Sequence, residues 1–343
     1  MIAMTRRLLL QSLAAGAAPV SFGRKIRVAF IGNEGHVGEI TKPLNTVPEI
    51  EIVAADRADP KLRAKKTYKN WREMLDSEKD LDVVAVTNDN GGRAEAIIAC
   101  AQRKLNVIAE KPLALTREDL ARVRDAVQTN GISLGMLLTM RYEPPYLAMR
   151  ERMLAGEVGD VLQMSSQKSY KLGNRAEWFK SRRTYGGTIA WIGIHMIDLM
   201  RHIGGREFVE AASFQTRVGF PQFREMETVT TSMFRLDNGG LAELHMDYLR
   251  PESASTHGDD RLRIAGTKGV LEWQQSTGLV LQTQAGKPTT ITSLPQHGEL
   301  FLDYLRATYS GGKPSITVDD MFRVTEITIA AQQAADLGRI VKI

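Results

Sequence analysis

A turn with three glycines is the first feature of the sequence that could do chemistry. Gly32, Gly35 and Gly38 directly follow the apolar run 27–31. Dinucleotide-binding turns have the pattern G-x-G-x-x-G, whose glycines allow the tight turn, the close approach of a phosphate and the packing of the next helix. Gly35 and Gly38 have the spacing of the last two glycines, whereas Gly32 lies one residue too early. The turn therefore indicates a dinucleotide site, with a helix from about His36 pointing its N-terminus at the pyrophosphate.

A carboxylate stands where the ribose of such a cofactor would lie. Asp56 follows the apolar run 51–55, which predicts a second strand. A carboxylate here accepts hydrogen bonds from the ribose hydroxyls and repels a 2′-phosphate, which favours NAD. The neighbouring Arg57 could hold that phosphate, so NADP is the alternative. The residues predicted to bind the cofactor in this part of the chain are Gly32, Asn33, Gly35, His36, Val37, Asp56 and Arg57.

Alternating strands and helices must position these groups. Short apolar runs predict buried strands at 27–31, 51–55, 81–86, 106–109 and 132–136. Helical patterns separate them at about 71–75, 93–104 and 116–129. Strands that alternate with helices at this spacing predict a parallel, doubly wound sheet of the Rossmann type.

The pattern changes after about residue 140. Alternating runs with glycine turns predict a mostly antiparallel sheet. These runs are 161–170, 209–218, 228–236, 240–248, 261–264, 270–273 and 279–283, with helices at about 144–155, 188–202, 297–309 and 318–336. The sequence thus predicts an α/β chain: a signal peptide at 1–23, a Rossmann domain at 24–139 and an α+β domain with a large open sheet at 140–343.

The first 23 residues are typical of an export signal. Arg6 and Arg7 precede a short apolar stretch and a small-residue site at 15–17. Paired arginines there are typical of a twin-arginine signal. We therefore expect a periplasmic or otherwise exported protein, delivered by the twin-arginine export machinery. The apolar stretch is shorter than the roughly 20 residues that cross a bilayer, so no membrane span is expected after signal removal.

Composition argues against other classes of protein. The formal charge is +5, but Lys and Arg are scattered among Asp and Glu, so nucleic acid is not an expected partner. The single cysteine, Cys100, lies in an apolar run and predicts a buried thiol. His195 and Asp198 have a spacing that metal ligands use, but no further histidine lies nearby in sequence, so no metal site is expected.

Two later motifs resemble the Gfo/Idh/MocA oxidoreductases. Glu110-Lys111-Pro112 follows the fourth predicted strand, and the segment 186–198 is similar to the family's G-G-x-x-x-D-x-G-x-H-x-x-D. The turn 266–269 is also typical of the family, and the resemblance covers nearly the whole chain past Gly23. It places Glu110, Lys111 and Pro112 beside the cofactor. Asn88 and Asn90, after the third predicted strand, complete the predicted cofactor-binding residues.

The resemblance also implies which residues are catalytic. In the family, the residues that correspond to Lys111 and His195 face the reacting carbon. Hydride leaves a secondary alcohol only as the hydroxyl proton is removed. A neutral imidazole is a suitable base near pH 7, and an ammonium group can polarise the developing oxyanion. The resemblance therefore implies a nicotinamide-dependent oxidoreductase that acts on a sugar, polyol or glycoside.

One position departs from the family pattern. Four residues before the histidine the family often has an aspartate that orients the base, and this chain has Trp191. Because residues i and i+4 share a helix face, Trp191 and His195 should both line the cleft. The indole could stack on a sugar, or it could pack in the core. Asp198 or Lys111 would have to take over the orienting work, or the chemistry differs.

Further residues of the second domain are predicted to line the substrate cleft. Lys168 and Tyr170 differ by two positions in a predicted strand, so they share a face. The full set of predicted substrate residues is Arg141, Tyr142, Lys168, Tyr170, Trp178, Tyr185, Trp191, Asp198 and His257.

Two alternative functions stay open. The same cofactor could support transient oxidation of a sugar ring, with cleavage of a glycoside or isomerisation, followed by re-reduction, and the missing aspartate keeps this alternative open. A non-catalytic dinucleotide-binding protein is the second alternative, against which Lys111 and His195 argue. The resemblance further implies a homo-oligomer formed through the C-terminal sheet.

Overall fold

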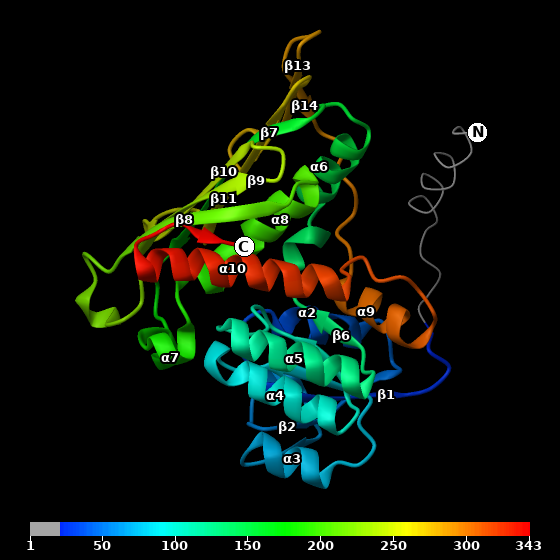
Figure 1. The fold of residues 1–343 in the computed structure, drawn as a ribbon. Coiled ribbons are helices and arrows are strands. Elements are labelled where there is room, and N and C mark those ends of the chain that lie inside the picture. The colour runs from blue at the N-terminus through cyan, green and yellow to red at the C-terminus, as the bar shows by residue number, and fades with distance from the viewer. Residues whose placement is uncertain (1–20) are drawn as a thin grey trace.

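The computed structural model describes residues 21–343, which form two sheets with helices packed against them (Figure 1). The first sheet is parallel, with its strands in the order β3-β2-β1-β4-β5-β6. The strands are β1 (Ile26–Gly32), β2 (Ile50–Ala55), β3 (Lys66–Thr67), β4 (Val83–Thr87), β5 (Asn106–Ala109) and β6 (Leu134–Met136). The intervening helices are α2 (Val37–Thr41), α3 (Trp71–Ser77), α4 (Asn90–Gln102) and α5 (Arg117–Asn130). The predicted doubly wound sheet is confirmed.

The strand order reverses next to β1, which creates the crevice where ligands of such sheets bind. From β1 the chain builds outward to β2 and β3, and then returns to add β4 on the other side of β1. Gly32 and Thr87, the last residues of β1 and β4, are paired. The glycine turn after β1 therefore lies at this crevice.

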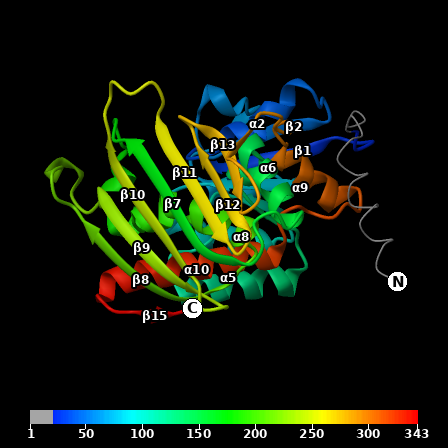
Figure 2. The same ribbon diagram turned by 90° about the horizontal axis from the view of Figure 1, so that it is seen from above.

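Helices cover one face of the second sheet. Its strand order is β14-β13-β12-β11-β7-β10-β9-β8-β15, and only the β7–β10 pair is parallel. The strands are β7 (Val161–Lys171), β8 (Phe208–Thr216), β9 (Val229–Leu236), β10 (Leu241–Arg250), β11 (Gly258–Gly266), β12 (Gly269–Gln274), β13 (Gly278–Thr283), β14 (Thr289–Ile291) and β15 (Val341–Lys342). The helices on one side are α6 (Pro144–Leu154), α8 (Ile194–Gly204) and α10 (Val318–Leu337). Exposed and buried residues alternate along β9, so the other face is open (Figure 2).

The structure differs from the sequence prediction at three places. α2 has only five residues, because Pro43 cannot donate a helical hydrogen bond and the chain continues as a 3-10 turn. The predicted helix at 188–202 begins instead with a π-helical turn, Ile189–Gly193, before α8. The edge strands β3, β14 and β15 were missed, because two or three residues are too few to show a period.

The late part of the chain returns to the first sheet. Tyr309, at the end of α9 (Leu300–Tyr309), donates to the carbonyl of Asp82 (2.9 Å) and accepts from Nδ2 of Asn106 (3.0 Å). The ring of Tyr304 lies so close to Gly135 in β6 that a Cβ there would come within 2.7 Å of it. The two halves of the chain are therefore tied together.

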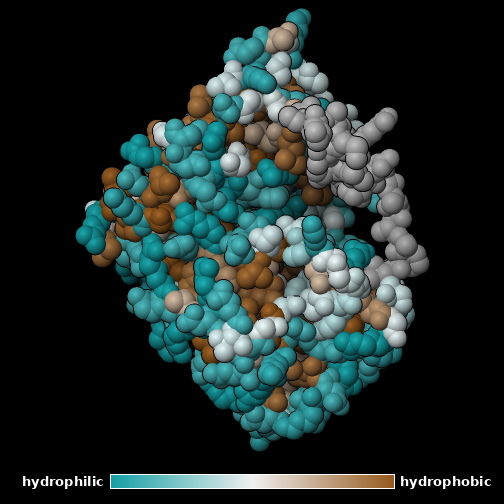
Figure 3. Space-filling view, turned by 45° about the vertical axis from the view of Figure 1, so that its right-hand side comes forward, coloured by the Kyte–Doolittle hydropathy of each residue, from teal (hydrophilic) through white to brown (hydrophobic). Residues whose placement is uncertain are grey.

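The surface shows no continuous apolar belt on the face seen in Figure 3, where apolar residues are interspersed with polar ones. Among residues 21–343, no helix is both long and apolar enough to cross a membrane. The proposed export signal lies almost wholly outside the described residues.

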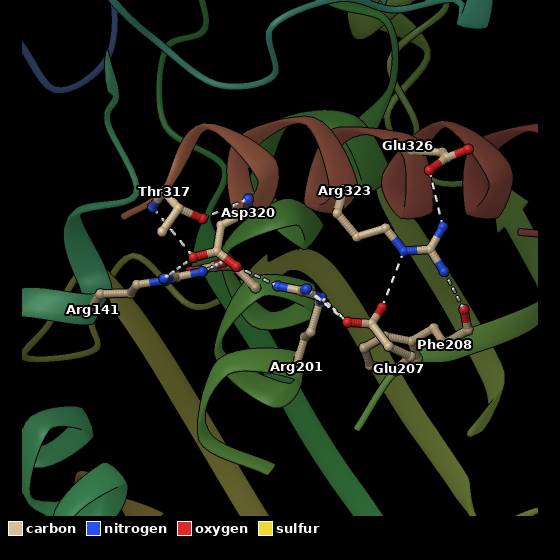
Figure 4. A network of polar contacts seen from close by, with 9 residues as sticks. Arg141, Arg201, Glu207, Phe208, Thr317, Asp320, Arg323 and Glu326 are labelled. Carbon is tan, nitrogen blue, oxygen red and sulfur yellow. Dashed lines mark hydrogen bonds and ion pairs between the residues drawn. The ribbon is translucent and has the colours of Figure 1, made fainter. Parts of the chain in front are cut away.

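A network of alternating charges fixes α8 against α10 (Figure 4). Arg141, between the two sheets, donates to both carboxylate oxygens of Asp198 on α8 (2.8 and 2.5 Å). Asp320 at the start of α10 accepts from Arg141 (3.2 Å) and from Arg201 on α8 (2.6 Å). The network continues through Glu207, Arg323 and Glu326 to Arg117 on α5. The Arg141–Asp198 pair is buried, and removing one partner of a buried ion pair costs about 3–5 kcal/mol.

Candidate active site

The protein's own packing requires the first two glycines of the turn. Gly32 and Gly35 both have positive φ angles, 81° and 68°. A Cβ on Gly32 would collide with the backbone of Asn88, and one on Gly35 would collide with the carboxylate of Glu110. A Cβ on Gly38, in contrast, would meet no atom within 4 Å outside its own helix in the described part of the chain. The third glycine is therefore not needed for helix packing.

Asp56 is held against the glycine turn at the end of β2. Its Oδ1 accepts hydrogen bonds from the backbone N–H of Gly32 (2.9 Å) and from Nε of Arg57 (3.2 Å). Arg57 also donates to Asn33 (3.2 Å), and Asn33 donates to Asp59 (2.8 Å). The predicted ribose-binding residues thus form one cluster beside the crevice. Asp59 was not predicted, because an aspartate before a proline is typical of an ordinary turn.

Arg93, which the sequence analysis missed, supports the other side of the crevice. Its side chain is completely buried in the first turn of α4. It donates to the carbonyl oxygens of Asn88 (2.5 Å), Lys111 (3.0 Å) and Pro112 (3.0 Å), and to the side chain of Asn90 (2.7 Å). Burial lowers the pKa of Arg93 to about 10, so it stays charged at neutral pH. Its partners are mostly backbone atoms, which leave no signal in the sequence.

The two asparagines after β4 have different surroundings. Nδ2 of Asn90 donates to the carbonyl of Tyr185 (2.6 Å) and so reaches the second half of the chain. Oδ1 of Asn88 is buried and has no hydrogen-bond partner within residues 21–343. A buried oxygen without a partner costs about 1–3 kcal/mol, and a donor on a bound ligand would remove this cost. Asn88 therefore fits a ligand in the crevice.

Glu110 is a fully buried carboxylate that joins the glycine turn to the end of β5. It accepts hydrogen bonds from the backbone N–H groups of His36 (2.8 Å) and Lys111 (2.6 Å), and it also contacts the ring of His36. Burial acts to raise the pKa of Glu110, but the charges of His36 and Lys111 outweigh it and lower this pKa to about 2. Glu110 is therefore negatively charged at neutral pH.

Lys111 places a buried amine between Glu110 and Trp191. Its Nζ donates to the backbone carbonyl of Trp191 (2.6 Å), lies 4.0 Å from Oε2 of Glu110, and lies 3.4 Å from the centre of the indole ring. Burial lowers the pKa of Lys111 to about 7, although Glu110 acts in the opposite direction. The amine is therefore present in charged and neutral forms near pH 7, which suits a group that exchanges a proton.

His195, in the first turn of α8, lies beside the glycine turn. Its ring meets that of His36 edge to face, with 5.0 Å between the ring centres. Nδ1 of His195 is buried and has no hydrogen-bond partner in the part of the chain that the structure describes. Burial, followed by the charges of Lys111 and His36, lowers the pKa of His195 well below its ordinary value. The imidazole is therefore neutral at pH 7 and free to bond a ligand.

Trp191, for which sugar stacking and core packing were both open, and Asp198, a candidate for orienting His195, have other partners. The indole of Trp191 is 8% exposed and packs edge-on against Trp178, with 5.1 Å between ring centres. Asp198 gives both of its oxygens to Arg141. The structure thus gives Asp198 a structural pairing in place of the expected orienting role. The direct partner of Trp191 is Lys111, through the backbone carbonyl and the ring.

Three of the predicted substrate residues meet at one end of the second sheet. Nζ of Lys168 donates to Asp260 (2.8 Å), and its side chain is fully buried. Tyr170 packs against His257, with 5.0 Å between ring centres. Nζ of Lys168 lies 4.9 Å from the centre of the Tyr170 ring, in agreement with the predicted shared face of these two β7 residues, and His257 directly precedes β11.

Other predicted substrate residues point elsewhere. Arg141 is part of the charge network behind α8, and Tyr142 donates to Asp303 on α9 (2.7 Å). Both were predicted from their place after the first sheet, but their polar ends are taken by helices of the second half. The hydroxyl of Tyr185 is buried with that of Tyr248 (3.0 Å). Within residues 21–343, no three His, Cys, Asp or Glu side chains form a group that could hold a metal.

Two models of known protein families match most of the chain. Residues 26–137 match the oxidoreductase family described as the NAD-binding Rossmann fold of GFO/IDH/MocA proteins. Residues 146–272 match the GFO/IDH/MocA C-terminal domain.

Individual proteins are similar over most of the chain. A solved oxidoreductase from Thermotoga maritima is 34% identical, covers 93% of this chain and 100% of its own, and superimposes with a TM-score of 0.85. The myo-inositol 2-dehydrogenase of Thermotoga maritima is 23% identical over 82% of this chain and 86% of its own length. A levoglucosan dehydrogenase in complex with NADH, 19% identical, covers 93% of this chain and 99% of its own, with a TM-score of 0.78, and shares the fold.

Gly35 and Gly38 have different surroundings, so replacing each by alanine should affect stability differently. Gly35→Ala should destabilise the protein by about 1–3 kcal/mol, because it adds both a left-handed alanine and a collision with Glu110. Gly38→Ala should leave the stability unchanged or raise it by up to ~1 kcal/mol, because alanine is the better helix former. Urea unfolding without dinucleotide measures both. Equal stabilities of the two variants would contradict the packing described here.

The stability contributions of the two buried lysines should differ in their dependence on pH. The pKa of Lys111 is about 7 in the folded protein and 10.5 in the free side chain, so above pH 7 the unfolded chain binds more protons. The wild type should therefore gain on the order of 2 kcal/mol over Lys111→Met between pH 7 and pH 9.

Lys168 is the matched control. Its pKa is raised by Asp260, which outweighs burial, so it is protonated in both states up to pH 9. The cost of Lys168→Met should be the same at pH 7 and pH 9. Urea unfolding at the two values tests both variants, and a pH-independent cost of Lys111→Met would show that the amine is not destabilised by burial.

Proposed function

The chain belongs to the Gfo/Idh/MocA family of oxidoreductases, and we propose that it transfers hydride between a nicotinamide dinucleotide and a secondary alcohol of a sugar, polyol or glycoside. The main observation in support of this proposal is that Lys111 and His195 are both buried beside the crevice of a dinucleotide-binding sheet. Relatives named as inositol dehydrogenases support the substrate class.

The crevice residues fit a dinucleotide. The glycine turn lies at the crevice beside the ends of β1 and β4, and Asp56 at the end of β2 is at the expected ribose position. The unpaired oxygen of Asn88 can accept from the far end of the cofactor. The nicotinamide supplies or takes up the hydride. NAD is favoured by the carboxylate of Asp56, and one curated relative is an NADP-dependent scyllo-inositol dehydrogenase.

The protein's part in the reaction is to move the hydroxyl proton. The imidazole of His195 is neutral but a weak base, since its pKa is well below the ordinary value. The amine of Lys111, with a pKa of about 7, is matched to neutral pH. We assign the proton transfer chiefly to Lys111, and the orientation of the hydroxyl to His195. In alcohol oxidation the neutral amine takes the proton, and in carbonyl reduction the ammonium returns it.

A pH profile separates the two roles. For the wild type, kcat/KM for NAD-dependent oxidation should rise as the pH passes about 7, because Lys111 must be deprotonated. Lys111→Met and His195→Asn should each lose on the order of 10²–10⁴ in rate. The rise near pH 7 should vanish in Lys111→Met and persist in His195→Asn, and NADH binding should survive in both.

If the rise near pH 7 vanishes in His195→Asn and persists in Lys111→Met, His195 is the base and the assignment to Lys111 is wrong. If the wild type forms no NADH stoichiometrically from any sugar or polyol, hydride transfer to the cofactor is not the net reaction. Product formed without accumulation of NADH would then favour transient oxidation of the sugar ring.

We also propose export through the twin-arginine machinery. The support is the sequence alone, since Arg6 and Arg7 lie outside the described residues. Replacing both by lysine keeps the charge and should leave the protein in the cytoplasm, as followed by cell fractionation. Arg24→Lys, beyond the signal, is the control and should be exported normally. Normal export of the double variant would contradict the proposal.

Self-association through the open face of the second sheet stays a prediction. That face exposes Phe214 on β8, Met233 on β9 and Leu249 on β10, with 76%, 52% and 52% of their surface accessible.

A further inference from the structure

A cavity of about 280 Å³ lies at the end of the second sheet, next to the Lys168–Asp260 ion pair. Residues of α6, β7, β11 and β12 surround it. Aromatic rings and hydrogen-bonding groups are combined in its lining, which includes Glu143, Tyr146, Tyr170, His257, Asp260 and Trp273. Lys111 and His195 do not line this cavity, and neither does any residue that was predicted to bind the dinucleotide.

The cavity adjoins the reaction centre through Lys168. Nζ of this lysine lies 2.8 Å from Asp260 and 4.9 Å from the centre of the Tyr170 ring, and both of these residues line the cavity. Met246, which pairs with Lys168 between β10 and β7, lies against Gly193, two residues before His195. Lys168 and its strand neighbour Met246 therefore connect the lining of the cavity to the helix that carries His195.

The lining has the composition that binds a sugar ring. Tyr170 and His257 both line the cavity with their ring centres 5.0 Å apart, and aromatic rings suit the C–H face of a sugar. Oδ1 of Asp260 is buried without a hydrogen-bond partner among the residues that the structure describes, so a hydroxyl donor would satisfy it. Glu143 adds a second carboxyl group to the lining.

Other classes of ligand fit less well. An anion would meet two carboxyl groups, while the buried cation, Lys168, is already paired with Asp260. A wholly apolar ligand would leave those carboxyl groups without partners, which is costly. The volume lies just below the range of about 300–1,000 Å³ that is usual for drug-sized ligands, so it suits a single ring.

We propose that this cavity is a second sugar subsite, and that the substrate is a glycoside or disaccharide whose reacting ring lies at Lys111 and His195 while its neighbouring ring occupies the cavity. The inference rests on the proposed function and narrows its substrate class. Contacts with the second ring, remote from the reacting carbon, then hold the first ring in place for hydride transfer.

Binding to the holoenzyme tests the subsite directly. Calorimetry with NADH bound compares cellobiose, maltose and lactose with glucose and galactose. At least one disaccharide should bind about 10-fold or more tightly than its monosaccharides, the effect of one or two good contacts. His257→Ala and Trp273→Ala should abolish this advantage and leave monosaccharide binding within about twofold.

Two controls keep the result interpretable. His257 is exposed, so its replacement does not disturb the core, even if Trp273→Ala does. Trp71→Ala removes another half-buried tryptophan, which lies on α3 under Arg72, and should change no sugar affinity.

Two results would overturn the subsite: no disaccharide binds more tightly than its monosaccharides, or the cavity variants weaken both classes equally. If the wild type still forms NADH from a monosaccharide, the proposed function stands and only the subsite falls. Tight glycoside binding that depends on His257 but yields no NADH would keep the subsite and contradict hydride transfer as the net reaction.

Discussion

Burial of the Lys111 amine is the constraint on which the rest of the site depends. A cation removed from water must find compensating groups. The chain provides the carboxylate of Glu110 at 4.0 Å, the carbonyl of Trp191 at 2.6 Å and the face of its indole at 3.4 Å. Glu110 in turn accepts from the N–H of His36, so one ammonium group connects the glycine turn, the end of β5 and the π-helical turn before α8. The compensation is incomplete, because the pKa falls to about 7, and this lets the amine exchange a proton near neutral pH.

Trp191 shows how the chain functions without an acid before His195. A carboxylate in its place would add negative charge near Lys111, and would raise the pKa of the amine. The indole leaves the charged amine less stabilised, and it leaves the imidazole without a group that would strengthen it as a base. This difference supports the proposed assignment of proton transfer to Lys111 and not to His195. The aromatic packing of Trp191 against Trp178 holds the π-helical turn that presents the carbonyl to Lys111.

Features that depend on neighbouring residues could be predicted from the sequence, and contacts between distant residues could not. The strand pattern, the glycine turn and Asp56 follow from local spacing, and the family motifs located Lys111 and His195. The pairing of Arg141 with Asp198 joins residues 57 positions apart, and it depends on where α8 packs. Arg93 was missed because its partners are mainly carbonyl groups, which every residue has.

Several contacts link the two sheets, and they determine how far the cavity lies from the catalytic residues. α9 packs on the first sheet, the charge network fixes α8 against α10, and Asn90 bonds the carbonyl of Tyr185 across the cleft. The separation between Lys111 and the cavity is therefore set by the fold. A free monosaccharide can be held only at its reacting end, whereas a glycoside of matching length contacts both places. Binding energy gained at the second ring orients the reacting carbon, so selection for a glycoside would act on the rate as well as on affinity.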